Sequence, residues 1–94
     1  NMRFNRTTYG EKIKQLRINK GLTQEQLAEK MNVTGTYIVK IENGQRIGSV
    51  ELAVELASCF GVSLDYLLLG AETRSRKQAI QSVIAFLTEL EAGL

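Results

Sequence analysis

Apolar residues recur every three or four positions along most of the chain, and polar or glycine residues interrupt them at short intervals. This spacing is typical of amphipathic helices, and the apolar/polar alternation of strands is scarce. The pattern predicts helices over about 9–20, 23–31, 34–43, 49–60, 64–69 and 72–91. We therefore expect an all-α fold.

Two of the predicted helices follow one another after a very short break. Thr23 begins the first and is followed three residues later by Gln26, the capping-box arrangement that satisfies two free backbone N–H groups. Asn32 tolerates the left-handed conformation of an abrupt turn, and Thr34 suits the start of the second helix. So short a turn forces the helices to cross steeply, which is helix-turn-helix geometry.

The length of 94 residues fits one compact domain. The single cysteine, Cys59, cannot form an internal disulfide and lies in an apolar helical pattern, so we expect it near the core. We see neither an apolar run of about 18 residues nor a signal peptide. These features predict a cytoplasmic protein without a membrane partner.

Charge is distributed unevenly along the chain. Residues 1–46 hold nine Lys/Arg and four Glu, a balance of +5, whereas residues 47–94 hold three Lys/Arg and six Asp/Glu, a balance of −3. A cationic half can attract a polyanion such as the phosphate backbone of a nucleic acid. The alternative is that the basic residues only solvate helix surfaces.

The motifs LTQEQLAEKMNV at 22–33, YIVKIENGQ at 37–45 and LASCFGVSLDYLLLG at 56–70 occur in this order. With them, residues 8–70 resemble the Cro/lambda-repressor-like helix-turn-helix family, also called XRE. The resemblance implies a five-helix lambda-repressor-like DNA-binding domain over 8–70, with its third helix as the recognition helix. It also implies a structural ion pair between Arg17 and Glu42 that holds this helix in place. Residues 71–94 then form a C-terminal amphipathic helix.

The helical repeat divides the recognition helix into two faces. If Thr34, Ile38 and Ile41 face the core, the opposite side presents polar groups and one small apolar side chain to a major groove. These candidate base-reading residues are Thr36, Val39, Lys40 and Asn43. The alternative interpretation is an ordinary solvated helix face.

A second set is expected to contact DNA phosphates from the ends of the two helices and the loop that follows. It consists of Gln24, Thr34, Gly35, Tyr37, Gln45 and Arg46. Arg6 and Lys12 are expected to be free to add non-specific attraction. Gly35 departs from the family pattern, because relatives often place a long polar side chain there. Glycine either admits a phosphate close to the backbone or lowers sequence discrimination.

The C-terminal helix carries an apolar stripe that Phe86 widens. Its candidate dimer-interface residues are Ile80, Val83, Ile84, Leu87 and Leu90. The stripe either packs back on the domain or pairs with its copy, and we expect a homodimer. The run Leu67–Leu69 is expected to extend the same surface.

The leading functional hypothesis is a sequence-specific, nucleoid-associated regulator of bacterial or phage type, a homodimeric repressor whose partner is double-stranded DNA. The alternative is a protein-interaction module with the same fold and little DNA sequence reading, for which Gly35 is the main argument. We do not expect the protein to be an enzyme. The chain has no histidine, no metal-ligand spacing and no phosphate-binding glycine loop, so no catalytic residue, metal or cofactor is predicted.

Overall fold

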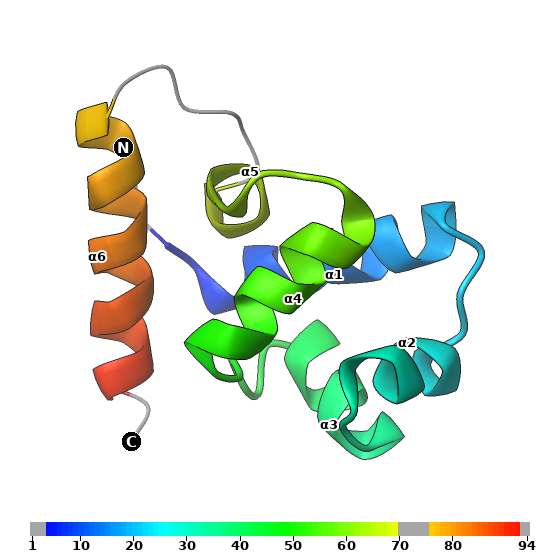
Figure 1. Cartoon of the computed structure of the whole chain (residues 1–94). Helices are drawn as coiled ribbons and strands as arrows, with labels where there is room; N and C mark the ends of the chain where they lie inside the picture. Colours follow the sequence, from blue (N-terminus) through cyan, green and yellow to red (C-terminus); the bar gives the residue numbers. More distant parts are fainter. Residues whose placement is uncertain (1–3, 70–75, 93–94) are drawn as a thin grey trace.

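The structure is a computed structural model that describes residues 4–69 and 76–92, and its regular elements there are all α-helices (Figure 1). They are α1 (Arg6–Asn19), α2 (Gln24–Met31), α3 (Gly35–Glu42), α4 (Val50–Phe60), α5 (Leu64–Leu69) and α6 (Arg76–Ala92). The all-α prediction is confirmed, with bounds close to those expected. The predicted start of the last helix near residue 72 lies outside the described residues.

The first helix begins three residues earlier than predicted. Asn5 is its N-cap, and the Asn5 side chain accepts a hydrogen bond from the backbone N–H of Thr8 at 3.0 Å. The apolar repeat becomes visible only at Tyr9, so this polar first turn escaped the periodicity argument.

The α2–α3 pair forms as its capping residues predict. The capping box of Thr23 and Gln26 is complete, and Asn32 ends α2 in the left-handed conformation with φ of 59°. Thr34 accepts a hydrogen bond from the backbone N–H of Tyr37 and so caps α3. Apolar side chains of both helices are buried where they meet, namely Leu27, Ala28, Met31, Ile38 and Ile41.

Close packing of α1 on the C-terminal end of α3 depends on Gly10. A Cβ atom added there would overlap the carbonyl oxygen of Ile41 and lie 2.8 Å from that of Glu42. Both are backbone atoms, which cannot rotate away as a side chain can. Gly10 therefore sets how closely α1 approaches α3, a role that the sequence pattern did not reveal.

The fourth and fifth helices cover the other side of α1. Ser49 caps α4, and Gly61 ends it in the left-handed conformation. Leu67 and Leu68 are only 1% and 2% exposed. The expectation that the Leu67–Leu69 run extends an exposed apolar surface was therefore wrong, because α5 turns these leucines into the core. Cys59 is half-buried beside the core, as expected.

The sixth helix packs back on the domain through an aromatic cluster. Phe86 lies 5.3 Å from the Phe4 ring and 5.9 Å from the Tyr9 ring, measured between ring centroids. Burial, with a smaller contribution from Tyr37, raises the pKa of the Tyr9 phenol far above its ordinary value, so Tyr9 stays neutral. Ser82 and Phe86 form the buried face of α6.

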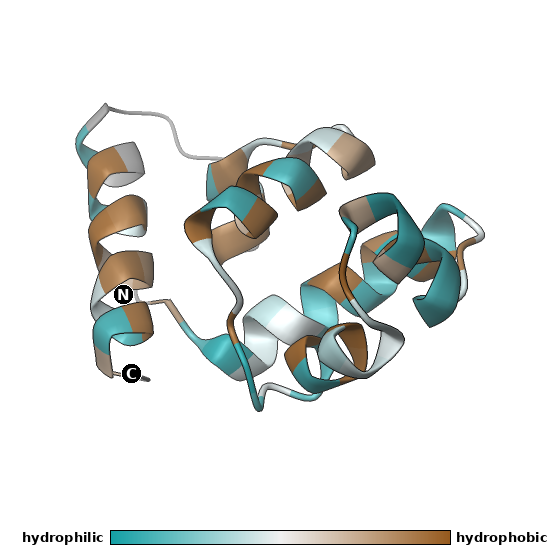
Figure 2. Ribbon diagram, turned by 60° about the horizontal axis from the view of Figure 1, so that its bottom comes forward, coloured by the Kyte–Doolittle hydropathy of each residue, from teal (hydrophilic) through white to brown (hydrophobic). Residues whose placement is uncertain are grey.

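The same helix keeps a second apolar face in solvent. Its exposed side chains are Ile80, Val83, Ile84 and Leu87, with fractional exposures from 38% to 56%. Leu90 is half-buried against the core. Figure 2 shows hydrophobic positions recurring along the length of α6. In the two described stretches, no helix is long and apolar enough to cross a bilayer.

Replacing Gly10 by alanine is expected to lower the free energy of unfolding by about 1–3 kcal/mol, because the new methyl group overlaps backbone that cannot move aside freely. Urea unfolding followed by circular dichroism measures this. Thr8→Ala, at an exposed position of the same helix, is the control and should change stability by less than about 0.5 kcal/mol. Equal stability of the two variants would contradict the close-packing role.

Candidate nucleic-acid interface

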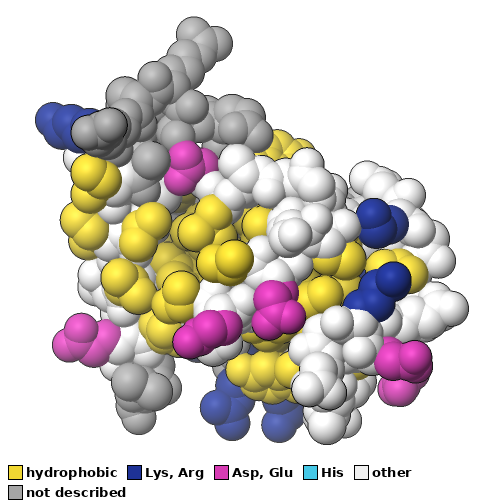
Figure 3. Space-filling view, viewed as in Figure 1, with side chains coloured by type: hydrophobic (Ala, Val, Ile, Leu, Met, Phe, Trp, Pro, Cys, Tyr) yellow, Lys and Arg dark blue, Asp and Glu magenta, His cyan; other side chains and the backbone are white. Residues whose placement is uncertain are grey.

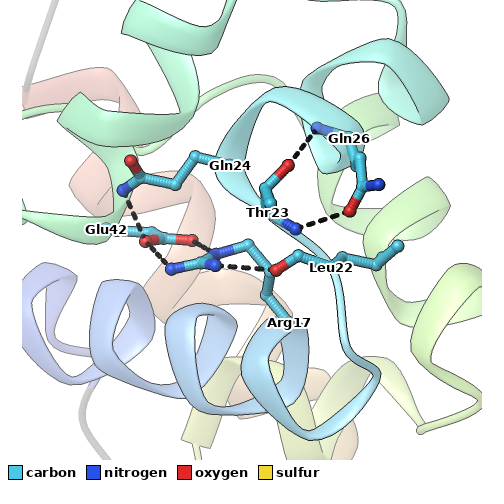
Figure 4. A network of polar contacts seen from close by, with 6 residues as sticks. All are labelled: Arg17, Leu22, Thr23, Gln24, Gln26 and Glu42. Atoms are coloured by element: carbon cyan, nitrogen blue, oxygen red, sulfur yellow. Dashed lines mark hydrogen bonds and ion pairs between the residues drawn. The ribbon is translucent and has the colours of Figure 1, made fainter.

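A nearly buried ion pair joins α1 to the last residue of α3. Nε of Arg17 donates to Oε2 of Glu42 at 2.7 Å, and Nη2 donates to Oε1 at 3.1 Å, so the pairing is bidentate (Figure 4). The side chains are 10% and 2% exposed. Nη1 of Arg17 also donates to the carbonyl oxygen of Leu22, just before α2, at 2.8 Å. The expected Arg17–Glu42 pair is thus present and ties three elements together.

Gln24 belongs to the same network. Its Nε2 donates to Oε1 of Glu42 at 3.0 Å, and the side chain is partly buried (Figure 4). An amide nitrogen carries two hydrogens, so one remains for a phosphate at the positive N-terminal end of α2. The hydrogen bond to Glu42, which the sequence did not predict, fixes where that hydrogen points.

The outer face of α3 is polar, as the helical repeat predicts. Thr36, Lys40 and Asn43 are exposed and Val39 is half-buried, whereas Ile38 and Ile41 are fully buried. The premise that Thr34 faces the core was wrong. Thr34 is exposed because an N-cap lies outside the helical repeat and turns its hydroxyl to the first turn of the helix.

The residues after α3 extend this face. Gln45 and Arg46 are exposed, and Tyr37 is half-buried against the core. Lys and Arg side chains protrude at the lower edge of the molecule, by α3 and the loop that follows it (Figure 3). A pocket of about 280 Å³ lies between Thr36, Lys40 and Arg46.

A larger pocket adjoins the interface on the side of α6. It has a volume of about 410 Å³, and Tyr37 and Arg46 line both pockets. Arg6, Ile47 and Leu90 complete much of its wall. Arg46 contributes an exposed guanidinium group to this hollow, whereas the guanidinium group of Arg6 is paired with Glu89.

Two cations predicted to be free are engaged within the domain. Arg6 lies 3.3 Å from the carboxylate of Glu89 on α6, with both side chains about one third exposed. Nζ of Lys12 hydrogen-bonds the hydroxyl of Tyr66 and lies 4.6 Å from the centre of its ring. Neither side chain is free as predicted, because their partners come from helices distant in the sequence. Only Arg6 is paired with an opposite charge, since Tyr66 is neutral.

Gly35, the first residue of α3, is half-buried. An added Cβ atom would overlap Oε1 of Glu25, on the first turn of α2.

Among the described residues, no group of three or more His, Cys, Asp or Glu side chains is placed to hold a metal ion.

The comparisons with known proteins agree with this geometry. The helix-turn-helix family model HTH_3 matches residues 13–67, so the chain belongs to this family of XRE-type helix-turn-helix proteins. The resemblance carried by the three sequence motifs is thereby confirmed.

Named relatives of the chain are transcriptional regulators. The HTH-type transcriptional activator BcrR of Enterococcus faecalis is 44% identical over 64 residues, which are 68% of this chain and 31% of BcrR. The chain thus spans about a third of that relative.

The fold of the chain is similar to those of solved transcription-regulator structures. The restriction-modification controller protein C.AhdI from Aeromonas hydrophila has a TM-score of 0.61 at 31% identity, covering 66% of this chain and 90% of its own. The clp gene regulator ClgR from Corynebacterium glutamicum has a TM-score of 0.66 at 26% identity, covering 96% and 93%. The latter alignment includes most of the region that holds α6.

Replacing Arg17 by alanine is expected to lower the free energy of unfolding by about 3–5 kcal/mol, because the carboxylate of Glu42 is left buried without its charge partner. Guanidinium unfolding curves measure this, with Lys14→Ala at an exposed position of α1 as the control. The double variant Arg17→Ala/Glu42→Gln should lose less free energy of unfolding than the sum of the losses in the two single variants. Strictly additive losses would contradict a direct coupling.

Proposed function

We propose that the chain is a sequence-specific DNA-binding transcriptional regulator that places α3 in the major groove of double-stranded DNA. The observation that carries the proposal is the exposed polar face of α3, which is held from behind by the Arg17–Glu42 pair. Membership of the helix-turn-helix family supports it, since the second helix of such a pair enters the major groove.

Each side chain on this face has a role that its chemistry suits. Lys40 donates to guanine O6 and N7, Asn43 pairs with adenine, and Val39 packs on a thymine methyl group. Thr36 hydrogen-bonds a base edge. Phosphate contacts come from the cationic and amide groups around α3, namely Gln24, Gln45 and Arg46, and from the Tyr37 hydroxyl, the Thr34 cap and the backbone at Gly35.

The chain acts as a homodimer in this proposal. The outer stripe of α6, which includes Ile80 and Ile84, is the surface for a second copy, and apolar side chains continue from α6 toward α4 and α5 in Figure 3. A twofold dimer is self-complementary, so one stripe covers the other. Two recognition helices about 34 Å apart then meet successive major grooves.

A repressor is the simplest regulatory outcome. A protein that occupies an operator excludes the transcription machinery without a further surface, whereas activation needs a contact with that machinery. The protein then acts in the cytoplasm on nucleoid DNA. The relative BcrR is named an activator, so a reporter gene with the selected site near its promoter decides the direction of regulation.

A second candidate function is a protein-interaction module that reads little DNA sequence. Two observations favour it, the missing side chain at Gly35 and the exposed apolar stripe of α6. Its signature is weak duplex binding that does not respond to salt. DNA binding through several phosphates instead weakens steeply, with a slope of about −0.9 per phosphate in a plot of log affinity against log salt.

Selection from a random duplex library tests the proposed function. We expect an enriched motif with twofold symmetry and half-sites about 10 base pairs apart, because that spacing matches two recognition helices on one side of the duplex. A library that shows no enrichment after repeated rounds contradicts sequence-specific binding. An enriched motif without symmetry contradicts the homodimer alone.

Replacing Lys40 by alanine is expected to weaken the best site by about 1–3 kcal/mol and to relax preference at one base pair, because a donor to a base edge is lost. Fluorescence anisotropy with duplexes that vary one position measures both effects. Lys77→Ala, at an exposed position of α6, is the matched control and should leave the preference unchanged. If the Lys40→Ala variant keeps the wild-type preference at every base pair, Lys40 does not read a base.

Replacing Ile84 by glutamate is expected to convert a dimer into a folded monomer, because the carboxylate would lie within an apolar contact. Sedimentation equilibrium measures the mass, and circular dichroism checks the fold. Gln15→Glu adds the same charge at an exposed position of α1, away from the α6 stripe, and should remain dimeric. A wild-type chain that is monomeric at micromolar concentration would refute this interface.

A further inference from the structure

The space above Gly35 is filled by a side chain from another helix. A Cβ atom added to Gly35 would overlap Oε1 of Glu25 and lie 2.9 Å from its Cδ. Glu25 is the second residue of α2 and is exposed, so its carboxylate reaches across to the first residue of α3. A side chain at position 35 would displace this carboxylate, which lies at the end of a flexible, exposed side chain.

This carboxylate lies at the end of α3 that matters most for reading DNA. The N-terminal residues of a recognition helix contact base edges. Thr34 and Thr36, on either side of Gly35, are both exposed. The positive N-terminal end of α3 also favours a negative group there. Position 35 therefore offers a polar group to the groove although its own residue has no side chain.

We propose that Glu25 is a specificity-determining residue, whose carboxylate accepts a hydrogen bond from the exocyclic amine of a cytosine in the major groove. The inference rests on the proposed function, because it needs α3 in that groove. An ionised carboxylate offers acceptors only. Cytosine presents the N4 donor alone, guanine presents two acceptors, and adenine adds the N7 acceptor to its donor. Cytosine is thus the base that a carboxylate distinguishes best.

The arrangement gives Gly35 a function that neither earlier interpretation contained. Glycine in a helix is less favourable than alanine by about 1 kcal/mol. Gly35 does not have a left-handed φ, so alanine fits its backbone and the only conflict is with Glu25. The glycine therefore makes room for a reading group from α2.

The test compares the wild type with Glu25→Gln, Gly35→Ala and the control Glu29→Gln in random duplex selection, followed by affinity measurements on duplexes that differ at one base pair. Glu29 lies one turn further along α2 and is exposed, so its replacement removes the same charge at a different place. Both glutamine variants should bind duplexes that lack the selected motif more tightly, because a negative charge near the phosphates is lost.

Only Glu25→Gln should change the motif. We expect one base pair per half-site to change from cytosine in the wild type to adenine, which glutamine contacts at N6 and N7, with about fivefold discrimination or more in each case. Gly35→Ala should weaken the cytosine preference at the same base pair, because the added methyl group displaces the carboxylate.

The outcomes separate this inference from the proposed function. A wild-type motif that Glu25→Gln leaves unchanged overturns the role of Glu25 and leaves α3 as the DNA-reading helix. A motif that changes equally in Glu25→Gln and Glu29→Gln also overturns it, since the effect is then general electrostatics. If the wild type selects no motif, the proposed function fails and the role of Glu25 fails with it.

Discussion

The direction in which α3 points depends on the buried carboxylate of Glu42. Apolar burial of Ile38 and Ile41 holds the helix to the core but is not directional. The carboxylate instead accepts hydrogen bonds of fixed geometry from Arg17 on α1 and Gln24 on α2. Gly10 then allows α1 to approach the same end of α3. One charged group thereby sets the orientation of the helix that presents the candidate DNA-binding face.

Each of the two surfaces proposed for function is the exposed face of one helix, α3 or α6, and the opposite face of the same helix packs on the core. α3 buries Ile38 and Ile41 and exposes Thr36 and Lys40. The helical repeat therefore places the residues that pack on the core and the residues proposed to contact DNA on different faces of α3. α6 buries Phe86 against the core and leaves a second apolar stripe in solvent. α6 packs on α5 and also contacts α1 through the Tyr9–Phe86 and Arg6–Glu89 pairs. Because α1 is paired with α3, a dimer formed through α6 would hold two α3 helices at a defined spacing.

The sequence predicted the features that depend on local chemistry. The caps Thr23 and Thr34, and the inward positions of Ile38 and Ile41, follow from helix geometry and were correct. The features that it missed depend on partners distant in the chain. The Arg6 pair with Glu89 joins residues 83 positions apart, and Gly10 matters only because α3 lies against it. Neither arrangement leaves a periodic pattern, so only the packed structure reveals them.

The most direct test of the central claim is an NMR titration of the isotope-labelled chain with a duplex that carries its selected site. We predict that amide signals change most in α3, in the first turn of α2 and in the loop around Arg46, which together form the exposed polar face. Changes confined to α6 and α4, or no change at micromolar duplex, would contradict the claim that this face binds DNA.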